Sequence, residues 1–378
     1  MYYFDYASTY PTDIEILEQC ILKRDDGIFN NPSSTHEEGI KAADLLSKAR
    51  QKIANILQCS TDEIIFTSGG SESDNTALKG VMLKYKPEEA ELITSTIEHP
   101  AILETCKQLE RFGYTIRYVK PNNKGYIGIE NIKKQINDKT KLISIMAINN
   151  ELGTMQDIYE IAHLAHTKGI LFHTDAVQAL GKIDLNLDTI DMASFSGHKV
   201  GALKGTGFLY VKTYVELEPL ICGGGQESNL RAGTENIFGN YMLALCLEKY
   251  YNNWTNFNIT YMNSLQDKIV QKLKTAFGDN IIINSNALGI VNIAFKNINS
   301  ETLQLMLSCK GDMVSVASAC HSNFSEPSYV LKEIGVPNEF LNGSLRISIS
   351  PDTKEFEVDN LIKNIILYAN HLIKIGKE

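Results

Sequence analysis

A short polar run, Ser196-Gly197-His198-Lys199, directly follows the apolar segment 192–195. A lysine in an apolar, partly dry site has a lowered pKa and can form a Schiff base with an aldehyde. Most single lysines are solvated surface charges, so Lys199 needs support from residues elsewhere in the chain.

Asp175 supplies a carboxylate 24 residues earlier, in the run Thr174-Asp175-Ala176-Val177-Gln178. An acid there could cap a helix, or it could hold a cationic ring nitrogen as a buried counter-charge. A third run, Ser68-Gly69-Gly70-Ser71-Glu72, joins a predicted strand to a predicted helix. Its glycines let the backbone approach a ligand, and the N–H groups of a helix N-terminus favour a phosphate. A plain glycine-rich turn is the alternative.

A phosphate site, an acid for a ring nitrogen and an aldehyde-trapping lysine are together what pyridoxal phosphate requires. The sequence contains neither G-x-G-x-x-G nor G-x-x-x-x-G-K-[ST], so dinucleotide and P-loop interpretations are weak. The three runs therefore predict pyridoxal phosphate as the cofactor, bound between Lys199 and Asp175.

Apolar strand-like segments precede these runs and must position them. Strand and helix patterns alternate over most of the chain, which predicts an α/β domain with a mostly parallel sheet flanked by helices. In such sheets ligands bind beyond the carboxyl ends of the strands, where the three runs lie. The predicted strands are 63–67, 92–95, 115–119, 142–146, 170–173, 192–195 and 207–211, and the predicted helices are about 75–85, 101–112 and 158–168.

From about residue 240 the pattern changes to a smaller α+β lobe. A long helix is followed by predicted strands at 281–283, 290–295, 313–316 and 345–349, and then by a closing helix. We therefore predict a large cofactor-binding domain at 14–245 and a small domain built from 1–13 and 246–378.

The composition is ordinary for a soluble globular protein, with 43% apolar and 21% charged residues in a chain of 378. A net charge of −9 argues against partners rich in phosphate, such as nucleic acid or an anionic membrane. No apolar run has bilayer-spanning length, and residues 1–6 lack the features of a secretory signal. Seven scattered cysteines, an odd number, indicate a cytoplasmic protein.

No metal site is predicted. The cysteines include no C-x-x-C pair. His163 and His166 are three residues apart on a predicted helix, but no carboxylate or cysteine stands at a supporting spacing, so an exposed helix face is the expectation.

The motifs together resemble the cysteine desulfurases of the nitrogenase and iron–sulfur-cluster maturation type, within the class V aminotransferase-like enzymes. The resemblance implies aminotransferase fold type I and a homodimer. The matching motifs are Asp5-Tyr6-Ala7, Asn31-Pro32-Ser33-Ser34, the segment 66–75, Glu98-His99-Pro100, Asn149-Asn150-Glu151-Leu152-Gly153, Asp175-Ala176-Val177-Gln178, Ser196-Gly197-His198-Lys199, Gly223-Gly224-Gly225-Gln226-Glu227, Arg231-Ala232-Gly233-Thr234-Glu235-Asn236, Ser318-Ala319-Cys320 and Arg346.

The resemblance implies roles around the cofactor ring. Lys199 would hold the cofactor and then move protons, and Asp175 would pair with the pyridine nitrogen. His99 would stack on the ring and assist acid–base steps. The ring hydroxyl would be contacted by Asn150 and Gln178.

The resemblance also implies how the phosphate and the substrate are bound. Thr234 of a second subunit would reach the phosphate. Arg346 would bind the carboxylate of L-cysteine through two parallel hydrogen bonds, helped by Asn31. The phosphate ligands from the same chain would be Gly70, Ser71, Ser196 and His198.

Cys320 is the predicted nucleophile. It lies in the small, polar stretch 316–325, which has the composition of a loop, so its thiol is expected to be exposed and able to ionise. Cys106 and Cys246 lie instead in helical, partly apolar runs. The resemblance implies that Cys320 takes the substrate sulfur as a persulfide, releases alanine, and passes the sulfur to an acceptor, either an iron–sulfur scaffold or a tRNA-thiolating enzyme.

Two other functions remain open. The Cys-His-Ser run at 320–322 also resembles selenocysteine lyases. The chain could also be a catalytically silent homologue that acts as a binding partner, although the intact Lys199, Asp175, His99, Arg346 and Cys320 argue against that.

Overall fold

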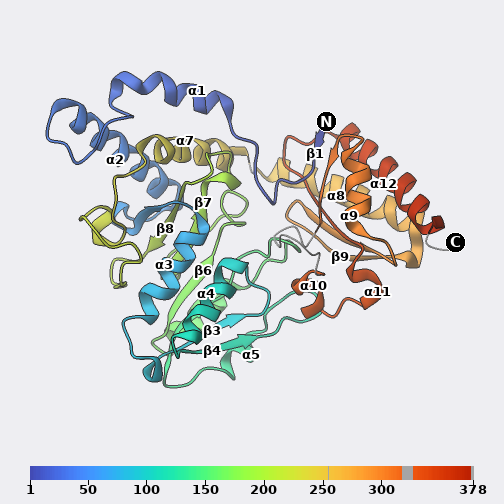
Figure 1. Ribbon diagram of the computed structural model, residues 1–378, viewed down its shortest axis with the longest axis horizontal. Helices are drawn as coiled ribbons and strands as arrows, with labels where there is room; N and C mark the ends of the chain where they lie inside the picture. The colour runs from blue at the N-terminus through green and yellow to red at the C-terminus, as the bar shows by residue number, and fades with distance from the viewer. Residues whose placement is uncertain (254, 317–326, 376–378) are drawn as a thin grey trace.

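The computed structural model describes residues 1–253, 255–316 and 327–375. It contains a seven-stranded sheet, a four-stranded sheet and a two-stranded pair. Figure 1 shows the two larger sheets in separate lobes, each with its own helices. The predicted architecture, an α/β part followed by a smaller α+β part, is confirmed.

The seven-stranded sheet has the order β2-β8-β7-β6-β5-β3-β4. Only β8 is antiparallel to its neighbours, so the prediction of a mostly parallel sheet is confirmed. All strands except the edge strand β4 are almost wholly buried, as expected where helices cover both faces. The strands are β2 (Ile64–Thr67), β3 (Glu91–Ser95), β4 (Thr115–Val119), β5 (Thr140–Ser144), β6 (Leu171–Asp175), β7 (Met192–Ser196) and β8 (Gly207–Val211).

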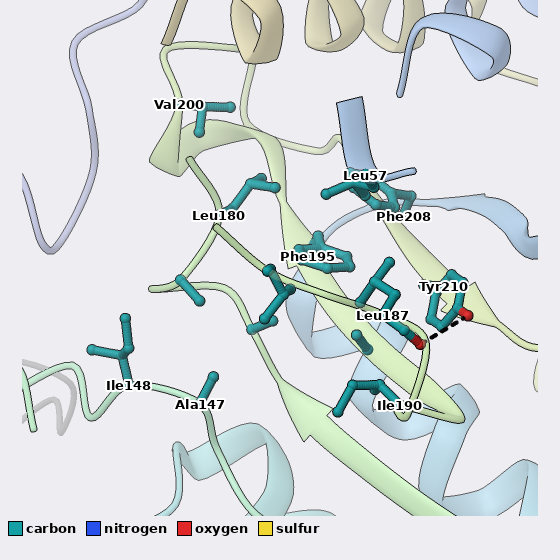
Figure 2. Packing of buried hydrophobic residues seen from close by; sticks show 14 of the residues in the cluster. Leu57, Ala147, Ile148, Leu180, Leu187, Ile190, Phe195, Val200, Phe208 and Tyr210 are labelled. Carbon is teal, nitrogen blue, oxygen red and sulfur yellow. Dashed lines mark hydrogen bonds between the residues drawn. The ribbon is translucent and has the colours of Figure 1, made fainter. Parts of the chain in front are cut away.

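Alternate side chains of these strands pack into two separate cores, as the two-residue period of a strand requires. Leu92 and Leu142 contribute to one core, and Ile93 and Ile143 to the other. Figure 2 shows the second core, where Phe195 and its neighbours pack beneath α2. The helices of this lobe are α1 (Ile14–Leu22), α2 (Glu37–Leu57), α3 (Gly70–Met82), α4 (Pro100–Arg111), α5 (Ile129–Lys133), α6 (Ile158–His166) and α7 (Ile237–Asn253).

The smaller lobe has an antiparallel sheet of order β12-β13-β10-β9. Its strands are β9 (Ile281–Ala287), β10 (Ile290–Phe295), β12 (Ser315–Val316) and β13 (Ser344–Ser348). Its helices are α8 (Asn256–Phe277), α9 (Ser300–Ser308), α11 (Asn338–Leu341) and α12 (Glu355–Ile375). The short helix α10 (Tyr329–Glu333) packs instead on the larger lobe, where Val330 and Leu331 join the core.

The N-terminus joins the two lobes. β1 (Tyr2–Tyr3) pairs with β11 (Asp312–Met313), and the fully buried Phe4 belongs to the core of the smaller lobe. A few residues later the chain is hydrogen-bonded to the larger lobe, from Tyr10 N to the His198 carbonyl at 2.8 Å. The predicted boundary after residue 245 falls inside α7, and the division into domains stays a prediction.

Candidate active site

A cavity of about 540 Å³ lies between the two lobes, at the carboxyl ends of β6 and β7. Its lining brings together residues from both lobes that are far apart in the sequence. Of the residues predicted to act in the site, those that line the cavity are Gly70, Ser71, His99, Asn150, Asp175, Gln178, Ser196, His198, Lys199 and Arg346.

Adjacent strands of the parallel sheet place the central residues. Asp175 is the last residue of β6 and Ser196 the last of β7, so both reach the same edge. A single 3-10 turn, η4 (Gly197–Lys199), then carries Lys199 into the cavity. His99 caps α4, where its Nδ1 accepts a hydrogen bond from Ala101 N at 3.2 Å.

Lys199 is held by the N-terminal segment. Its Nζ donates to the carbonyl oxygens of Ala7 and Ser8, each at 2.7 Å. Backbone carbonyls orient the amine without neutralising it, unlike a carboxylate. The amine therefore lies at a defined position on the cavity wall.

Three ionisable groups meet beside this lysine. Ligand atoms of Asp74, His99 and Asp175 all lie within 4.8 Å of one another. Burial raises the pKa of Asp175, against the opposing effects of His99 and Lys199, and burial lowers the pKa of His99. The Asp175 carboxylate accepts from Val177 N at 2.9 Å. A cationic ring nitrogen would supply the counter-charge that burial makes necessary.

The glycine run lies at the start of α3, and its residues Gly70 and Ser71 line the cavity. The helix begins at Gly70, inside the run and not after it as predicted, and Gly69 precedes it with a φ of 144° that other residues rarely adopt. A Cβ on Gly70 would come within 2.7 Å of Val177 Cγ2, so a larger residue there would have to displace that side chain. Burial beside Lys199 lowers the pKa of His198 to about 4, which leaves a neutral imidazole next to this helix end.

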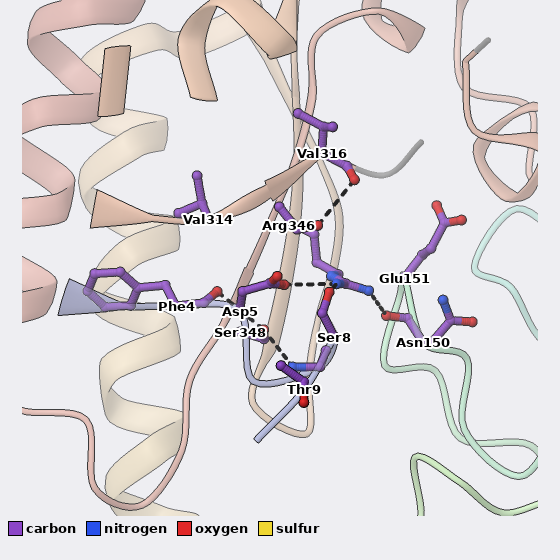
Figure 3. Close-up of polar contacts among 12 residues, drawn as sticks. Phe4, Asp5, Ser8, Thr9, Asn150, Glu151, Val314, Val316, Arg346 and Ser348 are labelled. Carbon is purple, nitrogen blue, oxygen red and sulfur yellow. Dashed lines mark hydrogen bonds and ion pairs between the residues drawn. The ribbon is translucent and has the colours of Figure 1, made fainter. Parts of the chain in front are cut away.

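Arg346 enters the cavity from β13 of the smaller lobe. Figure 3 shows its guanidinium held by hydrogen bonds to the Asn150 carbonyl at 2.8 Å, the Asp5 carboxylate at 3.0 Å and Ser8 Oγ at 2.5 Å. These contacts fix a buried cation that lines the cavity wall. A planar guanidinium held in this way suits a substrate carboxylate.

Several buried polar atoms of the cavity lack a partner within the part of the chain that the structure describes. They are Asp74 Oδ1, Asn150 Oδ1 and Arg346 Nε, half of the six such side-chain atoms found there. Because buried polar groups are nearly always hydrogen-bonded, a bound ligand would be expected to complete them.

Two predicted residues do not line this cavity, and a third lies outside the part of the chain that the structure describes. Asn31 is exposed, and its Oδ1 accepts from Ser33 N at 2.9 Å. Thr234 is exposed on the loop that precedes α7. Cys320 lies outside the described residues, although Val316 and Pro327, on either side of the undescribed segment, line the cavity. The roles of all three stay predictions.

Sequence reasoning assigned no role to several residues in or near the site. Glu98 and Glu151 lie within recognised motifs but were assigned nothing, and both are buried. Asp74 likewise belongs to the motif at 66–75. Lys182 carried only the weak signal of standing four residues after Gln178, and its Nζ donates to Gln178 Oε1 at 2.8 Å.

His166, predicted to lie on an exposed helix face, pairs with Asp191 through Nε2 and Oδ2 at 2.9 Å.

No helix in the described chain is both long enough and apolar enough to span a bilayer.

Comparison with known proteins identifies the family of this chain. Residues 2–361 match the aminotransferase class-V family. The cysteine desulfurase IscS of Dictyoglomus turgidum is 39% identical over 355 residues, covering 92% of this chain and 89% of that protein. The IscS of Methanosarcina thermophila is 38% identical over 367 residues, covering 96% and 90%.

Solved structures agree with the sequence comparison. A NifS-like protein superposes with a TM-score of 0.91 at 35% identity, covering 98% of this chain and all of that chain. A structure described as SspA in complex with cysteine gives a TM-score of 0.82 at 36% identity, covering 93% and 99%.

The fold and the cavity are those of the class-V aminotransferases, which depend on pyridoxal phosphate. Within that class the chain belongs to the cysteine desulfurase family. The residues present fit the cofactor, because the cavity combines an oriented lysine, the buried acid Asp175, an unpaired amide oxygen on Asn150 and a glycine-bounded helix N-terminus.

Proposed function

We propose that this protein removes sulfur from L-cysteine, giving L-alanine and a persulfide on Cys320. The observation that carries the proposal is the single cavity that brings together Lys199, Asp175, His99 and Arg346. Relatives at 37–39% identity carry the name cysteine desulfurase, and a similar solved structure is described as a complex with cysteine.

In this proposal the cofactor is held along the wall of the cavity. Lys199 would bind the aldehyde of the cofactor, Asp175 would pair with its ring nitrogen, and His99 would contact the ring. When bound, pyridoxal phosphate supplies an electron sink for the bond that breaks at the substrate α-carbon. The ring hydroxyl is contacted by Asn150 and Gln178, and the phosphate by Gly70, Ser71, Ser196 and His198.

The substrate is bound through its carboxylate by Arg346, with Asn31 assisting. Lys199 moves the proton of the α-carbon, because its amine is oriented toward the cavity by two carbonyls. The Cys320 thiolate then attacks the substrate sulfur. The new S–S bond forms as the C–S bond breaks, the electron pair passes to the substrate carbon, and a proton completes alanine.

The protein acts as a homodimer in this proposal. Thr234 is exposed and does not line the cavity of its own chain, which supports a contribution of Thr234 to the phosphate site of a second subunit. We propose a cytoplasmic location, supported by six unpaired thiols among the described cysteines. The sulfur acceptor would be an iron–sulfur scaffold or a tRNA-thiolating enzyme.

Mass spectrometry of the protein after exposure to L-cysteine tests the proposal. We expect one added sulfur atom on Cys320, alanine in the solution, and loss of both sulfide release and persulfide in Cys320→Ala. Cys309→Ala, which removes an exposed thiol elsewhere, is the matched control and should behave as the wild type. Full sulfide production by Cys320→Ala would refute the assignment of the nucleophile.

A further inference from the structure

Lys182 is a partly buried lysine next to the cavity but not in its lining. Its Nζ donates to Gln178 Oε1 at 2.8 Å, and within the described chain no carboxylate lies at ion-pair distance from it. Burial, together with the cations Lys199 and Arg346, lowers the pKa of Lys182 to about 7. A buried amine opposed by two cations and paired only with a neutral oxygen is costly, and such arrangements occur mainly where function requires them.

The partner amide is held at both ends. Gln178 is 4% exposed and lines the cavity. Its Nε2 donates to the Ala7 carbonyl at 2.8 Å, while its Oε1 accepts from Lys182. Turning the amide over would place oxygen against the Ala7 carbonyl and N–H groups against the lysine amine. The Ala7 carbonyl and the protonated Lys182 amine together therefore oppose the flipped orientation.

One N–H group of Gln178 remains after these two contacts. An amide has two N–H donors and one oxygen, and the oxygen and one donor are already engaged. The Ala7 carbonyl also accepts from Lys199 Nζ at 2.7 Å, so Lys182, Gln178, Ala7 and Lys199 form one continuous set of hydrogen bonds. Such a set can transmit a change at Lys182 to the lysine that binds the cofactor.

We propose that Lys182 is a positioning residue, which orients the Gln178 amide so that its remaining N–H donates to the ring oxygen of the cofactor. Its positive charge also acts on the cofactor and on Lys199. This inference rests on the proposed function, because it concerns the same cofactor site.

The test uses the cofactor-loaded protein without substrate. The visible absorption of the bound cofactor is titrated with pH, and cofactor affinity is measured by dialysis and reloading. Lys182→Met removes both the charge and the donor that holds Gln178. We expect the midpoint of the spectral change to rise by about one pH unit and cofactor affinity to fall about tenfold. Lys182→Arg, which keeps charge and donors, should restore most of both.

A double-mutant cycle separates positioning from a purely structural role. If Lys182 acts through Gln178, Lys182→Met should change cofactor affinity much less in a Gln178→Leu background. Lys212→Met is the matched control, because Lys212 is also partly buried and bonds a neutral oxygen, that of Asp188, at 3.0 Å. Lys212 follows the last residue of β8, which runs antiparallel to its neighbours. Lys212 therefore lies at the end of the sheet opposite to the cavity.

An unchanged spectral midpoint and cofactor affinity in Lys182→Met would overturn the inference. So would equal effects of Lys182→Met with and without Gln178. Failure of the proposed function is recognised separately, because a wild-type protein that gains no cofactor absorption or no persulfide would show it. If Lys182→Met does not fold, Lys182→Arg and Gln178→Leu still test whether the lysine and the amide act together.

Discussion

Glu98 is a fully buried carboxyl group close to the acids that face the cavity. It accepts hydrogen bonds from Ser95 Oγ at 2.6 Å and from Met146 N at 3.0 Å. Burial, aided by the nearby Asp175, raises the pKa of Glu98 to about 8 despite these bonds. Glu151, whose pKa burial raises to about 7, lies next to Arg346 and bonds Ser328. Burial thus raises the pKa of both acids to neutral pH or slightly above it.

We predict that Glu98 makes the stability of the protein fall as the pH rises. Folding raises this pKa, so the native state holds a proton that the unfolded state has lost, and stability declines from the unfolded pKa up to about 8. In Glu98→Gln, the decline of the unfolding free energy with rising pH should become shallower by about 1.4 kcal/mol per pH unit between about pH 5.5 and 7.5. Urea denaturation measures this slope. An exposed control, Glu130→Gln, should leave it unchanged, and an equal slope in Glu98→Gln would contradict the prediction.

At the scale of elements, the loop before α7 contains a strained turn, η5 (Glu227–Asn229). Its residues Glu227, Ser228 and Asn229 have φ values of 47°, 57° and 66°, a left-handed conformation that non-glycine residues seldom adopt. Glu227 is held by Arg50 through two bonds of 2.8 and 2.7 Å, and by Phe66 N at 2.8 Å. Since Glu227 is 7% exposed, this anchor fixes the loop that carries Thr234.

We predict that Glu227→Ala destabilises the protein by about 3 to 5 kcal/mol, because it leaves the Arg50 cation and the Phe66 N–H without their partner. The same change should make the loop at 222–234 more sensitive to limited proteolysis. Lys52→Ala is the control, because it breaks a more exposed ion pair with Glu248 and should cost less than about 1 kcal/mol. The anchor has no special role if both variants unfold at the same urea concentration.

At the scale of the whole molecule, the N-terminal segment connects the two lobes and the site. Phe4 packs in the core of the smaller lobe. The side chains of Asp5 and Ser8 bind Arg346. The carbonyls of Ala7 and Ser8 bind Lys199. Figure 3 shows this segment running beside Arg346. The lysine and the arginine are therefore oriented by the same short stretch of chain.

We predict that Phe4→Ala costs about 3 to 5 kcal/mol of stability and also raises the KM for L-cysteine several-fold. The reason is that loosening Phe4 frees the segment that holds Arg346. Leu303→Ala, in the same core but away from that segment, should lose about 2 to 5 kcal/mol with little change in KM. The KM for L-cysteine is measured by steady-state kinetics below the unfolding temperature of both variants. Equal KM values for Phe4→Ala and Leu303→Ala would contradict the prediction.

Much of the larger lobe could be predicted from local patterns. The buried strands appeared as continuous apolar runs, and the polar residues after them had to reach the same sheet edge because neighbouring strands run parallel. For that reason Asp175 and Lys199, 24 residues apart, were placed together correctly. Sequence reasoning also placed the glycine run at the start of a helix, although it missed that α3 starts inside the run.

The types and order of the residues at the strand ends were enough to predict the cofactor class. How the lobes meet could be seen only in the folded chain. Contacts such as the bond from Gln178 to the Ala7 carbonyl, 171 residues away, depend on packing that the local hydrophobic pattern does not encode. The burial of a side chain is likewise known only from the folded structure. In the sequence Lys182 cannot be told from a surface lysine, and its lowered pKa follows from desolvation in the folded chain.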